Sequence, residues 1–275
     1  MKPILKWAGG KSSLINDIKK YIPPDIYNRK YHEPFLGGGA LFFEVEPIKG
    51  TINDINNRLM NFYKIVKERP EELIKEASKY QKYSTNTEIY YELRDEYNKD
   101  NISDIESAAL LLYLNKTAYN GLYRVNSQNI FNVPIGKYKN PTIVNKKRIR
   151  DASLILKNIE ILHTDFTYIL DKADEGDFCY FDPPYYQPEA NKFKDYSQNG
   201  FNYDDHKRLC ETCVKLTEKK VFFILSNSNN PTIKNMYKKE NFEVIEVDNK
   251  WMISCNASSR EKITEILVHN TSSID

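Results

Sequence analysis

The placement of glycine constrains this chain more than any other feature of its sequence. The 275 residues include 10 glycines, where the average usage of about 7% would give roughly 19. Five of them (Gly9, Gly10, Gly37, Gly38 and Gly39) lie in the first 39 residues. Two such clusters in a glycine-poor chain indicate backbone that needs positive φ or a close approach to another group. The alternative is two ordinary turns.

The second glycine cluster lies in a strand–turn–helix pattern. From Tyr31, the text YHEPFLGGGALFFEV predicts a strand, a tight turn and the start of a helix. Residues 51–56 predict a second short strand, and Asp54 lies 17 residues after Gly37. A βαβ unit of this kind binds nucleotides, and an acid about 20 residues after the glycines binds ribose hydroxyls. The pairing favours an adenosine-containing cofactor over an Asp54 that merely serves a turn.

The rest of the chain alternates strands and helices, with one long interruption. Apolar residues at helical spacing predict helices between residues 57 and 115, with Ser103 or Asp104 as the cap of the last one. Residues 121–141 predict a hairpin with a polar turn at 127–129. Further segments complete an α/β pattern: helices at 145–156 and about 204–219, and strands at 159–163, 178–181, 221–226, 242–247 and 263–268.

These segments predict an α/β fold that is split in two along the sequence. We expect a catalytic, cofactor-binding domain of residues 1–56 plus 145–275, and an insertion of residues 57–144 that is mostly helical and recognises the target. The composition agrees with a globular chain, since 40% of residues are hydrophobic, 28% are charged and the net charge is +2. A near-neutral total excludes a simple polycationic coat for nucleic acid.

The same sequence excludes several other classes of protein. No stretch approaches the ~20 apolar residues that span a bilayer, and the N-terminus lacks the apolar run of a signal peptide. The four cysteines (Cys179, Cys210, Cys213 and Cys255) are too few and too irregularly spaced for a secreted disulfide scaffold. We therefore expect an intracellular, cytoplasmic protein that makes no use of a membrane.

The clearest chemical motif is Asp182-Pro183-Pro184-Tyr185, directly after the apolar run Phe178–Phe181. Two prolines fix φ and remove two N–H donors, and each biases the residue before it towards an extended conformation. The motif therefore presents the Asp182 carboxylate and the Pro183 carbonyl as acceptors at the end of a strand, with Tyr185 as an aromatic face. A plain Asp-Pro-Pro turn is the alternative.

This set suits a planar ring that carries an exocyclic amino group. Two acceptors can hold both amino hydrogens while the ring stacks on Tyr185. The nitrogen lone pair of such a group is delocalised into its ring, which makes the nitrogen a poor nucleophile. Acceptors on its hydrogens favour tetrahedral geometry and stabilise the positive charge that develops on attack, so no covalent protein intermediate is required.

Two further segments indicate binding. Lys6-Trp7-Ala8-Gly9-Gly10-Lys11 lacks the spacing of a phosphate loop and is better explained as an aromatic and cationic wall against a cofactor or DNA. Residues 107–150 contain no Asp or Glu, although the chain average would place about six there. Eight Lys and Arg interleaved with aromatic residues in this segment favour a polyanion over an ordinary solvated face.

The cysteines and histidines carry less information. His206, Cys210 and Cys213 have the spacing of three metal ligands on one helix face, but a fourth ligand is not apparent. Leu209, Cys213 and Leu216 also follow an apolar stripe, so burial is the better interpretation. No cysteine follows a proline, as the nucleophile of a cytosine-C5 methylase typically would.

In order along the chain, these motifs resemble those of DNA adenine-N6 methyltransferases of the Dam type, a D12-class, alpha-group family that includes GATC methylases. The matching text covers nearly the whole chain: KWAGGK, EPFLGGGALFFE, INDIN, YNGLYRVNSQNIFNVPIGKYKNP, GDFCYFDPPY, ILSNS and SSREKITEILV. The resemblance implies a Rossmann-like S-adenosylmethionine-dependent methyltransferase sheet with a mostly helical target-recognition insertion that carries a β-hairpin.

The resemblance also implies cofactor, substrate and partners. S-adenosyl-L-methionine would donate the methyl group and leave as S-adenosyl-L-homocysteine, with no metal involved. The acceptor would be N6 of a flipped-out adenine in double-stranded DNA, in the site GATC. A cognate restriction endonuclease acting on the same site would fit such an enzyme, as would a monomer or a weak dimer in a bacterial cell or a virus-infected host.

Individual residues receive roles from the same resemblance. Asp182, Pro183, Pro184 and Tyr185 would be catalytic. The cofactor site would comprise Trp7, Ala8, Gly9, Lys11, Pro34, Phe35, Gly37, Gly38, Gly39, Asp54, Asp165, Phe166 and Asp182. DNA would be bound by Lys6, which resembles a lysine that reads the first guanine, and by the hairpin region: Tyr119, Asn120, Leu122, Arg124, Asn132, Pro134, Lys137, Tyr138 and Lys139.

Some points stay open at this level. Arg124 suits a bidentate contact to guanine O6 and N7, whereas Tyr119 and Leu122 could instead be core residues at the base of the hairpin. Lys137 stands where several relatives carry Arg, which keeps the charge and loses the fork. Two other functions compete: N-methylation of RNA adenine or a protein amide, which the hairpin insertion disfavours, and a non-catalytic DNA-binding regulator, which the intact motifs disfavour.

Overall fold

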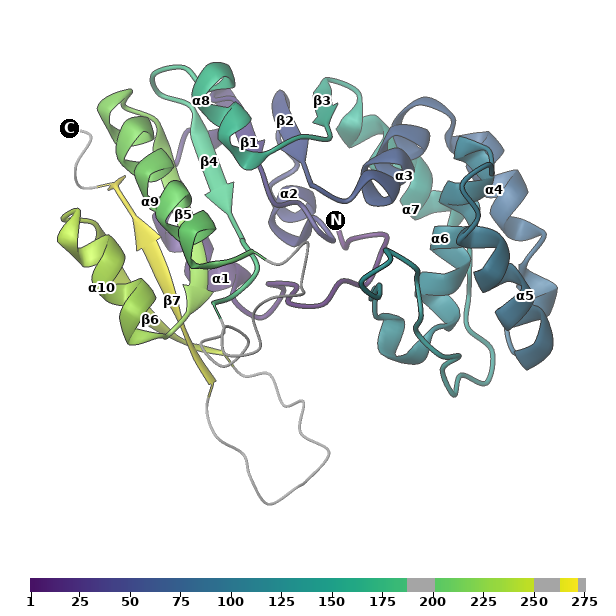
Figure 1. The fold of residues 1–275 in the computed structure, drawn as a ribbon. Helices are drawn as coiled ribbons and strands as arrows, with labels where there is room; N and C mark the ends of the chain where they lie inside the picture. Colours follow the sequence, from purple (N-terminus) through teal and green to yellow (C-terminus); the bar gives the residue numbers. More distant parts are fainter. Residues whose placement is uncertain (187–200, 250–262, 272–275) are drawn as a thin grey trace. The chain divides into compact units, whose positions relative to one another are not determined.

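The computed structural model describes residues 1–186, 201–249 and 263–271 (Figure 1). Cys255 and the first five residues of the SSREKITEILV text lie outside the described residues. The chain forms two compact units, and each is described by itself. Unit 1 comprises Met1–Gly10, Leu36–Glu46 and Asn53–Thr164. Unit 2 comprises Lys11–Phe35, Pro47–Ile52 and Asp165–Asp275.

The strands form a seven-stranded sheet in the order β3-β2-β1-β4-β5-β7-β6. β1 (Tyr31–Glu33) pairs in parallel with β2 (Gly50–Asn53) and β4 (Phe178–Phe181), and β4 pairs in parallel with β5 (Phe222–Ser228). β7 (Ile263–His269) is antiparallel to both β5 and β6 (Glu243–Asn249). This is a Rossmann-like sheet, so the predicted α/β fold is confirmed. The strand order reverses between β1 and β4, and open α/β sheets bind ligands beyond the carboxyl ends of strands at such a point.

The two long helices of unit 2 begin at residues that favour the start of a helix. In α9 (Tyr203–Glu218), the Asn202 side chain accepts from the N–H groups of Asp204 and Asp205. The Asp205 side chain accepts from the Asn202 N–H in return, which completes a capping box. α10 (Pro231–Lys239) begins with Pro231 and the Asn230 cap. α9 packs on β5, and α10 packs on α9 and β6 (Figure 1). Unit 2 also holds two four-residue helices, α1 (Ile15–Ile18) and α8 (Ile169–Lys172).

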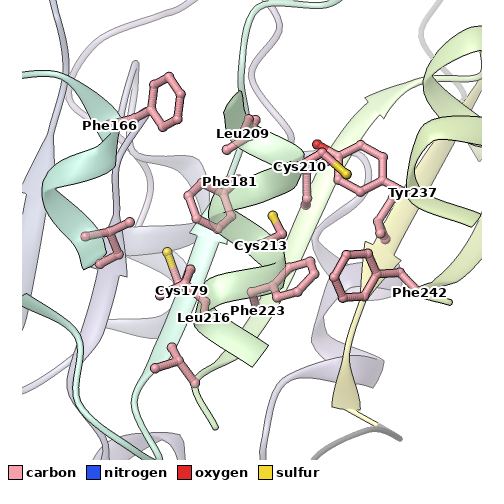
Figure 2. Close-up of a cluster of buried hydrophobic side chains, with 14 of the residues drawn as sticks. Phe166, Cys179, Phe181, Leu209, Cys210, Cys213, Leu216, Phe223, Tyr237 and Phe242 are labelled. Carbon is pink, nitrogen blue, oxygen red and sulfur yellow. The ribbon is translucent and has the colours of Figure 1, made fainter. Parts of the chain in front are cut away.

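The core of unit 2 lies between the sheet and these helices. The apolar stripe of α9 (Leu209, Cys213 and Leu216) joins Phe181 of β4 and Phe223 of β5 in one buried cluster (Figure 2). His206, Cys210 and Cys213 are all buried, as the helical stripe predicts. Burial raises the pKa of the Cys210 thiol to about 12 and that of Cys213 well above its usual range, so both thiols are inert.

Unit 1 is built around a helix that is apolar on all sides. α6 (Asp104–Thr117) buries Ala108 to Leu114 without a gap, because three other helices pack against it. The Ser103 side chain caps α6, as one of the two predicted caps. The other elements of unit 1 are α2 (Ala40–Val45), α3 (Asn57–Glu68), α4 (Pro70–Ser78), α5 (Thr87–Tyr97), α7 (Lys146–Leu156) and β3 (Ile159–Leu162).

The predicted hairpin doubles back as expected but forms no regular strands. Antiparallel bridges occur only at Ala118–Ile135 and Val125–Phe131 within the described part of this segment. The Asn98 side chain takes both backbone groups of Phe131, at 2.8 and 3.0 Å. These two groups point away from Val125, because the bridge there is made by Asn126 N–H to Ile130 and Asn132 N–H to Arg124. Further along the returning segment Pro134 has no N–H to donate, so a longer ladder does not form.

Two expectations concern the chain as a whole. We predict residues 57–144 as an insertion that recognises the target. The division into compact units does not test this role, so the boundaries of the insertion stay a prediction. No helix in the described ranges has the length and apolar character needed to cross a bilayer.

Candidate active site

The candidate residues fall into one group in each unit. Unit 2 holds Lys11, Pro34, Phe35, Asp165, Phe166 and the Asp182–Tyr185 motif. Unit 1 holds Lys6 to Gly9, the glycine turn, Asp54 and the hairpin residues. The KWAGGK motif is thus divided after Gly10.

Asp182 follows β4 directly and is bound through one carboxylate oxygen. Lys11 Nζ lies 2.8 Å from Oδ1, and the Ser226 hydroxyl on β5 donates to the same atom at 3.1 Å. Ser226 also contacts the Tyr180 hydroxyl at 2.9 Å. Among the described residues none donates to Oδ2, and 21% of the Asp182 side chain is exposed. The second oxygen is therefore open to a ligand.

The charge of this carboxylate is balanced between opposing effects. Burial raises the pKa of Asp182, while the Lys11 ammonium and the Ser226 hydroxyl lower it and the nearby Glu265 carboxylate raises it. The net pKa is above its usual value. Lys11 is 3% exposed and is the cation that favours the ionised form.

The two prolines and Tyr185 complete the motif. Pro183 is buried and Pro184 exposed, and nothing in the described ranges donates to the Pro183 carbonyl. The Tyr185 hydroxyl donates to Glu265 on β7, and Lys11 Nζ lies 4.6 Å from the centroid of the Tyr185 ring. Lys11, which the family resemblance assigns to the cofactor, therefore contacts both Asp182 and Tyr185.

Ser226 and Glu265 are site residues that the sequence reasoning did not single out. Both lie inside text that was quoted only as part of the resemblance, ILSNS and SSREKITEILV. The available signal was a polar residue inside an apolar strand: Ser226 is 0% exposed and Glu265 is 5% exposed. Buried polar groups of this kind need partners, which directs attention to what lies beside them.

A second cluster of unit 2 surrounds Asp165, just after the predicted strand at 159–163. Its Oδ1 accepts from the Thr167 N–H and hydroxyl and from Arg208 at 2.9 Å. Burial opposes ionisation, but these donors together lower the pKa of Asp165. Arg208 also lies over the Phe166 ring, 5.0 Å from its centroid, and Phe166 packs on Phe35 at 5.4 Å. Oδ2 of Asp165 has no donor among the described residues.

In unit 1 the glycine turn and Asp54 form one structure. The Gly37 N–H donates to Asp54 Oδ2 at 3.0 Å, and the Asn56 N–H donates to Oδ1 at the same distance. Gly37 has φ of +49°, and a Cβ there would lie 2.7 Å from Trp7 Cδ1, so only glycine fits. Burial raises the pKa of Asp54, against the effect of the Gly37 and Asn56 N–H groups. Gly39, with φ of +68°, precedes α2.

The N-terminal segment is fixed to the insertion of unit 1. Trp7 lies against Gly37 and Gly38 on one side and stacks on Tyr123 of the hairpin at 5.0 Å on the other. Asn115 of α6 accepts from the Lys6 N–H at 2.9 Å and donates to the Lys6 carbonyl at 2.7 Å. The Lys6 side chain is exposed and lies over the Tyr138 ring, 4.9 Å from its centroid. Ala8 and Gly9 are exposed.

Most of the predicted DNA-binding residues are accessible. Tyr119 is 48% exposed, so it is not a core residue of the hairpin base, whereas Leu122 is half-buried. Arg124 is exposed, and its Nε donates to Asn132 Oδ1 at 2.8 Å. The remaining exposed members are Asn120, Pro134, Lys137 and Lys139. Asn120 has φ of +54° and Gly121 has φ of +67°, which gives this turn an unusual backbone.

Fold and site together define a class, an α/β protein with a Rossmann-like sheet whose acceptor motif suits an amino group. Comparison with known proteins makes this specific. Residues 7–253 match the model of the D12 class N6 adenine-specific DNA methyltransferase family, and the chain belongs to this family. It is an adenine-specific DNA methyltransferase.

Three curated relatives match nearly the full length of the chain. Type II methyltransferase M1.LlaDCHI of Lactococcus lactis subsp. cremoris is 44% identical, covering 98% of this chain and 95% of the relative. Type II methyltransferase M.MjaIII of Methanocaldococcus jannaschii is 39% identical, covering 98% and 99%. DNA adenine methylase of Escherichia coli K12 is 33% identical, covering 97% and 94%.

A bound metal ion needs several His, Cys, Asp or Glu side chains close together. In the described ranges no three His, Cys, Asp or Glu side chains gather as metal ligands do.

Proposed function

We propose that this enzyme transfers the methyl group of S-adenosyl-L-methionine to N6 of an adenine that is flipped out of duplex DNA, in the site GATC. One observation carries the proposal: Lys11 and Ser226 hold the Asp182 carboxylate through Oδ1, while no described residue donates to Oδ2 or to the carbonyl of the next residue, Pro183. The Tyr185 ring lies against the same Lys11 ammonium. This arrangement offers two acceptors and one aromatic face, the set that an aminopurine requires.

The chain's own residues explain how N6 becomes a nucleophile. Asp182 Oδ2 and the Pro183 carbonyl accept the two amino hydrogens, which favours tetrahedral geometry at N6 and stabilises the positive charge that develops there. When bound, S-adenosylmethionine supplies an electrophilic methyl group. Lys11 and Ser226 fix the carboxylate before the reaction, so little reorganisation is needed during it. The Asp182 carboxylate is also the acceptor beside the proton that N6 must lose.

Two sets of residues fit the cofactor. In unit 1, Asp54 keeps unused lone pairs after accepting from Gly37 and Asn56, and these suit ribose hydroxyls. In unit 2, Asp165 Oδ2 suits an amino group of the cofactor's adenine, and Phe35 and Phe166 suit its ring. The Trp7 ring packs closely against the backbone of the glycine turn Gly37–Gly39, and we include both in the proposed cofactor site. No metal enters this mechanism.

The proposal for DNA rests on the hairpin region of unit 1. Residues 107–150 are free of acids, and Tyr119, Asn120, Arg124, Lys137 and Lys139 are exposed there. Arg124 and Lys6 are assigned to guanines of GATC, where Arg suits O6 and N7. Base flipping follows from chemistry, because N6 inside a base stack is out of reach of a bound methyl donor.

The biological setting extends the proposal. Two relatives are named Type II methyltransferases, which supports a role beside a restriction endonuclease that cuts the same site. A methylase that acts without a partner endonuclease is the other setting. We propose action on DNA inside a cell, by a monomer or a weak dimer.

Transfer of radiolabelled methyl groups from S-adenosylmethionine to short duplexes tests the proposal. The substrates are a GATC duplex, a GTTC duplex, the GATC duplex already methylated at N6, and an RNA of the same sequence. We expect label on unmodified GATC alone. Label on every unmodified adenine-containing duplex would refute GATC specificity and leave adenine methylation intact. Label on RNA and not DNA would refute the proposed substrate.

A further inference from the structure

Glu265 is a buried carboxylate that the mechanism above does not use. It lies on β7 opposite Ser228 of β5 and is 5% exposed. The next three residues of β7, Ile266, Leu267 and Val268, are apolar and fully buried. Removing a carboxylate from water costs several kcal/mol unless it is partnered, so a carboxylate at this position needs a reason.

Its contact with Tyr185 supplies that reason. The Tyr185 hydroxyl donates to Glu265 Oε2 across 80 residues of sequence. Tyrosine has two side-chain torsions, so a ring whose hydroxyl is tied has little freedom left to tilt or rotate. On its other side the ring faces the Lys11 ammonium, 4.6 Å from its centroid. The ring is thus held at its edge and against one face.

Resting on the proposed function, we infer that Glu265 is a positioning residue, which holds the Tyr185 ring in the orientation that the target base stacks upon. Without this bond the ring could turn about its Cα–Cβ axis, and the stacked base would shift relative to the Asp182 and Pro183 acceptors. Misplacement of a reacting group by about 1 Å can cost ~10²-fold in rate.

The charge of Glu265 has a separate consequence. The groups that face Asp182 are Lys11 from the N-terminal segment, Tyr180 on β4, Tyr185, Ser226 on β5 and Glu265 on β7. Burial is the main cause of the raised pKa of Asp182, and the Glu265 carboxylate adds to it. Burial also raises the pKa of Tyr185, with Asp182 and Glu265 adding to it, so the phenol stays a donor.

Two substitutions separate the bond from the charge. Glu265→Gln keeps an oxygen that can accept from Tyr185 and removes the charge. Glu265→Leu removes both. Tyr185→Phe keeps the ring and removes the hydroxyl. Glu218→Gln, an exposed glutamate on α9, is the matched control. Melting temperature and S-adenosylmethionine affinity, measured for every variant, report on folding and cofactor binding.

The readout is the single-turnover rate of methyl transfer to a GATC duplex. For Glu265→Leu and Tyr185→Phe we expect a rate ~10–100-fold lower, with cofactor affinity unchanged. Their double mutant should be no slower than either alone, because both remove one interaction. Glu265→Gln should stay within ~3-fold of the wild-type rate, with its acid limb moved to lower pH. The control should match the wild type throughout.

The outcomes are separable. Wild-type rates in both Glu265→Leu and Tyr185→Phe, or losses that multiply in the double mutant, would overturn the positioning role alone. If Glu265→Leu does not fold, Tyr185→Phe decides: a wild-type rate there overturns the inference. No transfer to any adenine by the wild-type enzyme would refute the proposed function, and this inference with it.

Discussion

Two strand ends of this protein each carry a largely buried carboxylate, and they differ in what holds it. Asp54 follows β2 in unit 1 and accepts from the backbone N–H groups of Gly37 and Asn56, both at 3.0 Å. Asp182 follows β4 in unit 2 and is held by the side chains of Lys11 and Ser226. Burial raises the pKa of both carboxyls.

We assign the two carboxylates different roles: Asp54 stabilises a turn, whereas Asp182 takes part in the chemical step. Backbone donors belong to the conformation of the main chain, so Asp54 stabilises the glycine turn and in return is fixed by it. At Asp182 the side-chain donors Lys11 and Ser226 bind Oδ1, favour the ionised carboxylate and fix its orientation, while Oδ2 accepts from no described residue. We therefore expect substitutions at Asp54 to act on binding and those at Asp182 to act on the chemical step.

The largest effect should follow Asp182→Asn. The substitution removes the charge that stabilises the developing positive charge at N6, so methyl transfer should fall by ~10³-fold or more. It also leaves the buried Lys11 ammonium without its carboxylate, so a lower melting temperature is expected. Steady-state transfer to a GATC duplex measures the first effect. Binding of the duplex should survive, and its loss together with activity would make Asp182 a structural residue only.

Asp54→Asn should weaken cofactor binding. The amide keeps one oxygen but loses the charge that accepts from two N–H groups, so affinity for S-adenosylmethionine should fall ~10–100-fold. Titration calorimetry measures it. Asp100→Asn, at an exposed position in unit 1, is the control and should bind as the wild type does. Unchanged affinity in Asp54→Asn would remove this residue from the cofactor site.

A third substitution sharpens the comparison by touching neither carboxylate. Arg124→Ala should relax specificity at one base pair by ~1–3 kcal/mol and leave cofactor affinity as it is. Asn132→Ala should act in the same direction and less strongly, since the Asn132 side chain accepts from Arg124 and orients it. Competition among GATC duplexes with single base changes measures this. Equal weakening on every sequence, as we expect for Lys139→Ala, would instead mark Arg124 as a phosphate contact.

The smallest effect concerns the tuning of Asp182. Ser226→Ala removes a donor that lowers the pKa of Asp182. The pKa should rise, and because the ionised carboxylate is the active form, the acid limb of the rate profile should move to higher pH. At alkaline pH the rate should stay within ~10-fold of the wild type, as expected for the loss of one hydrogen bond to a charged group. If the acid limb stays at the same pH in Ser226→Ala, it does not report the ionisation of Asp182.

Local patterns predicted much of the fold and part of the site. The seven strands of the described residues lie where the sequence predicted strands, and Ser103 is the one of the two predicted caps that caps α6. Spacing singled out Asp54 as a candidate site residue, and the stiffness of the prolines singled out Asp182. The predicted hairpin has only two isolated bridges in its described part, and Pro134 has no N–H with which to extend the ladder.

The remaining site residues depend on contacts that no local pattern contains. Ser226 lies beside Asp182 because β5 pairs with β4, and Glu265 lies beside Tyr185 because β7 pairs with β5. Sequence order gives neither register. Lys11 was assigned to the cofactor by the family resemblance, and the structure shows that it also contacts Asp182 and Tyr185. α10 was missed although Asn230 and Pro231 are an ordinary start signal for a helix.

The most direct test compares the two carboxylates in one experiment: the single-turnover rate of methyl transfer to a GATC duplex at increasing S-adenosylmethionine, for Asp54→Asn and Asp182→Asn. The account predicts that Asp54→Asn approaches the wild-type rate once the cofactor saturates, whereas Asp182→Asn stays at least ~10³-fold slower at every concentration. A rate that saturating cofactor restores in Asp182→Asn, or that it cannot restore in Asp54→Asn, would contradict the division of roles between the two strand ends.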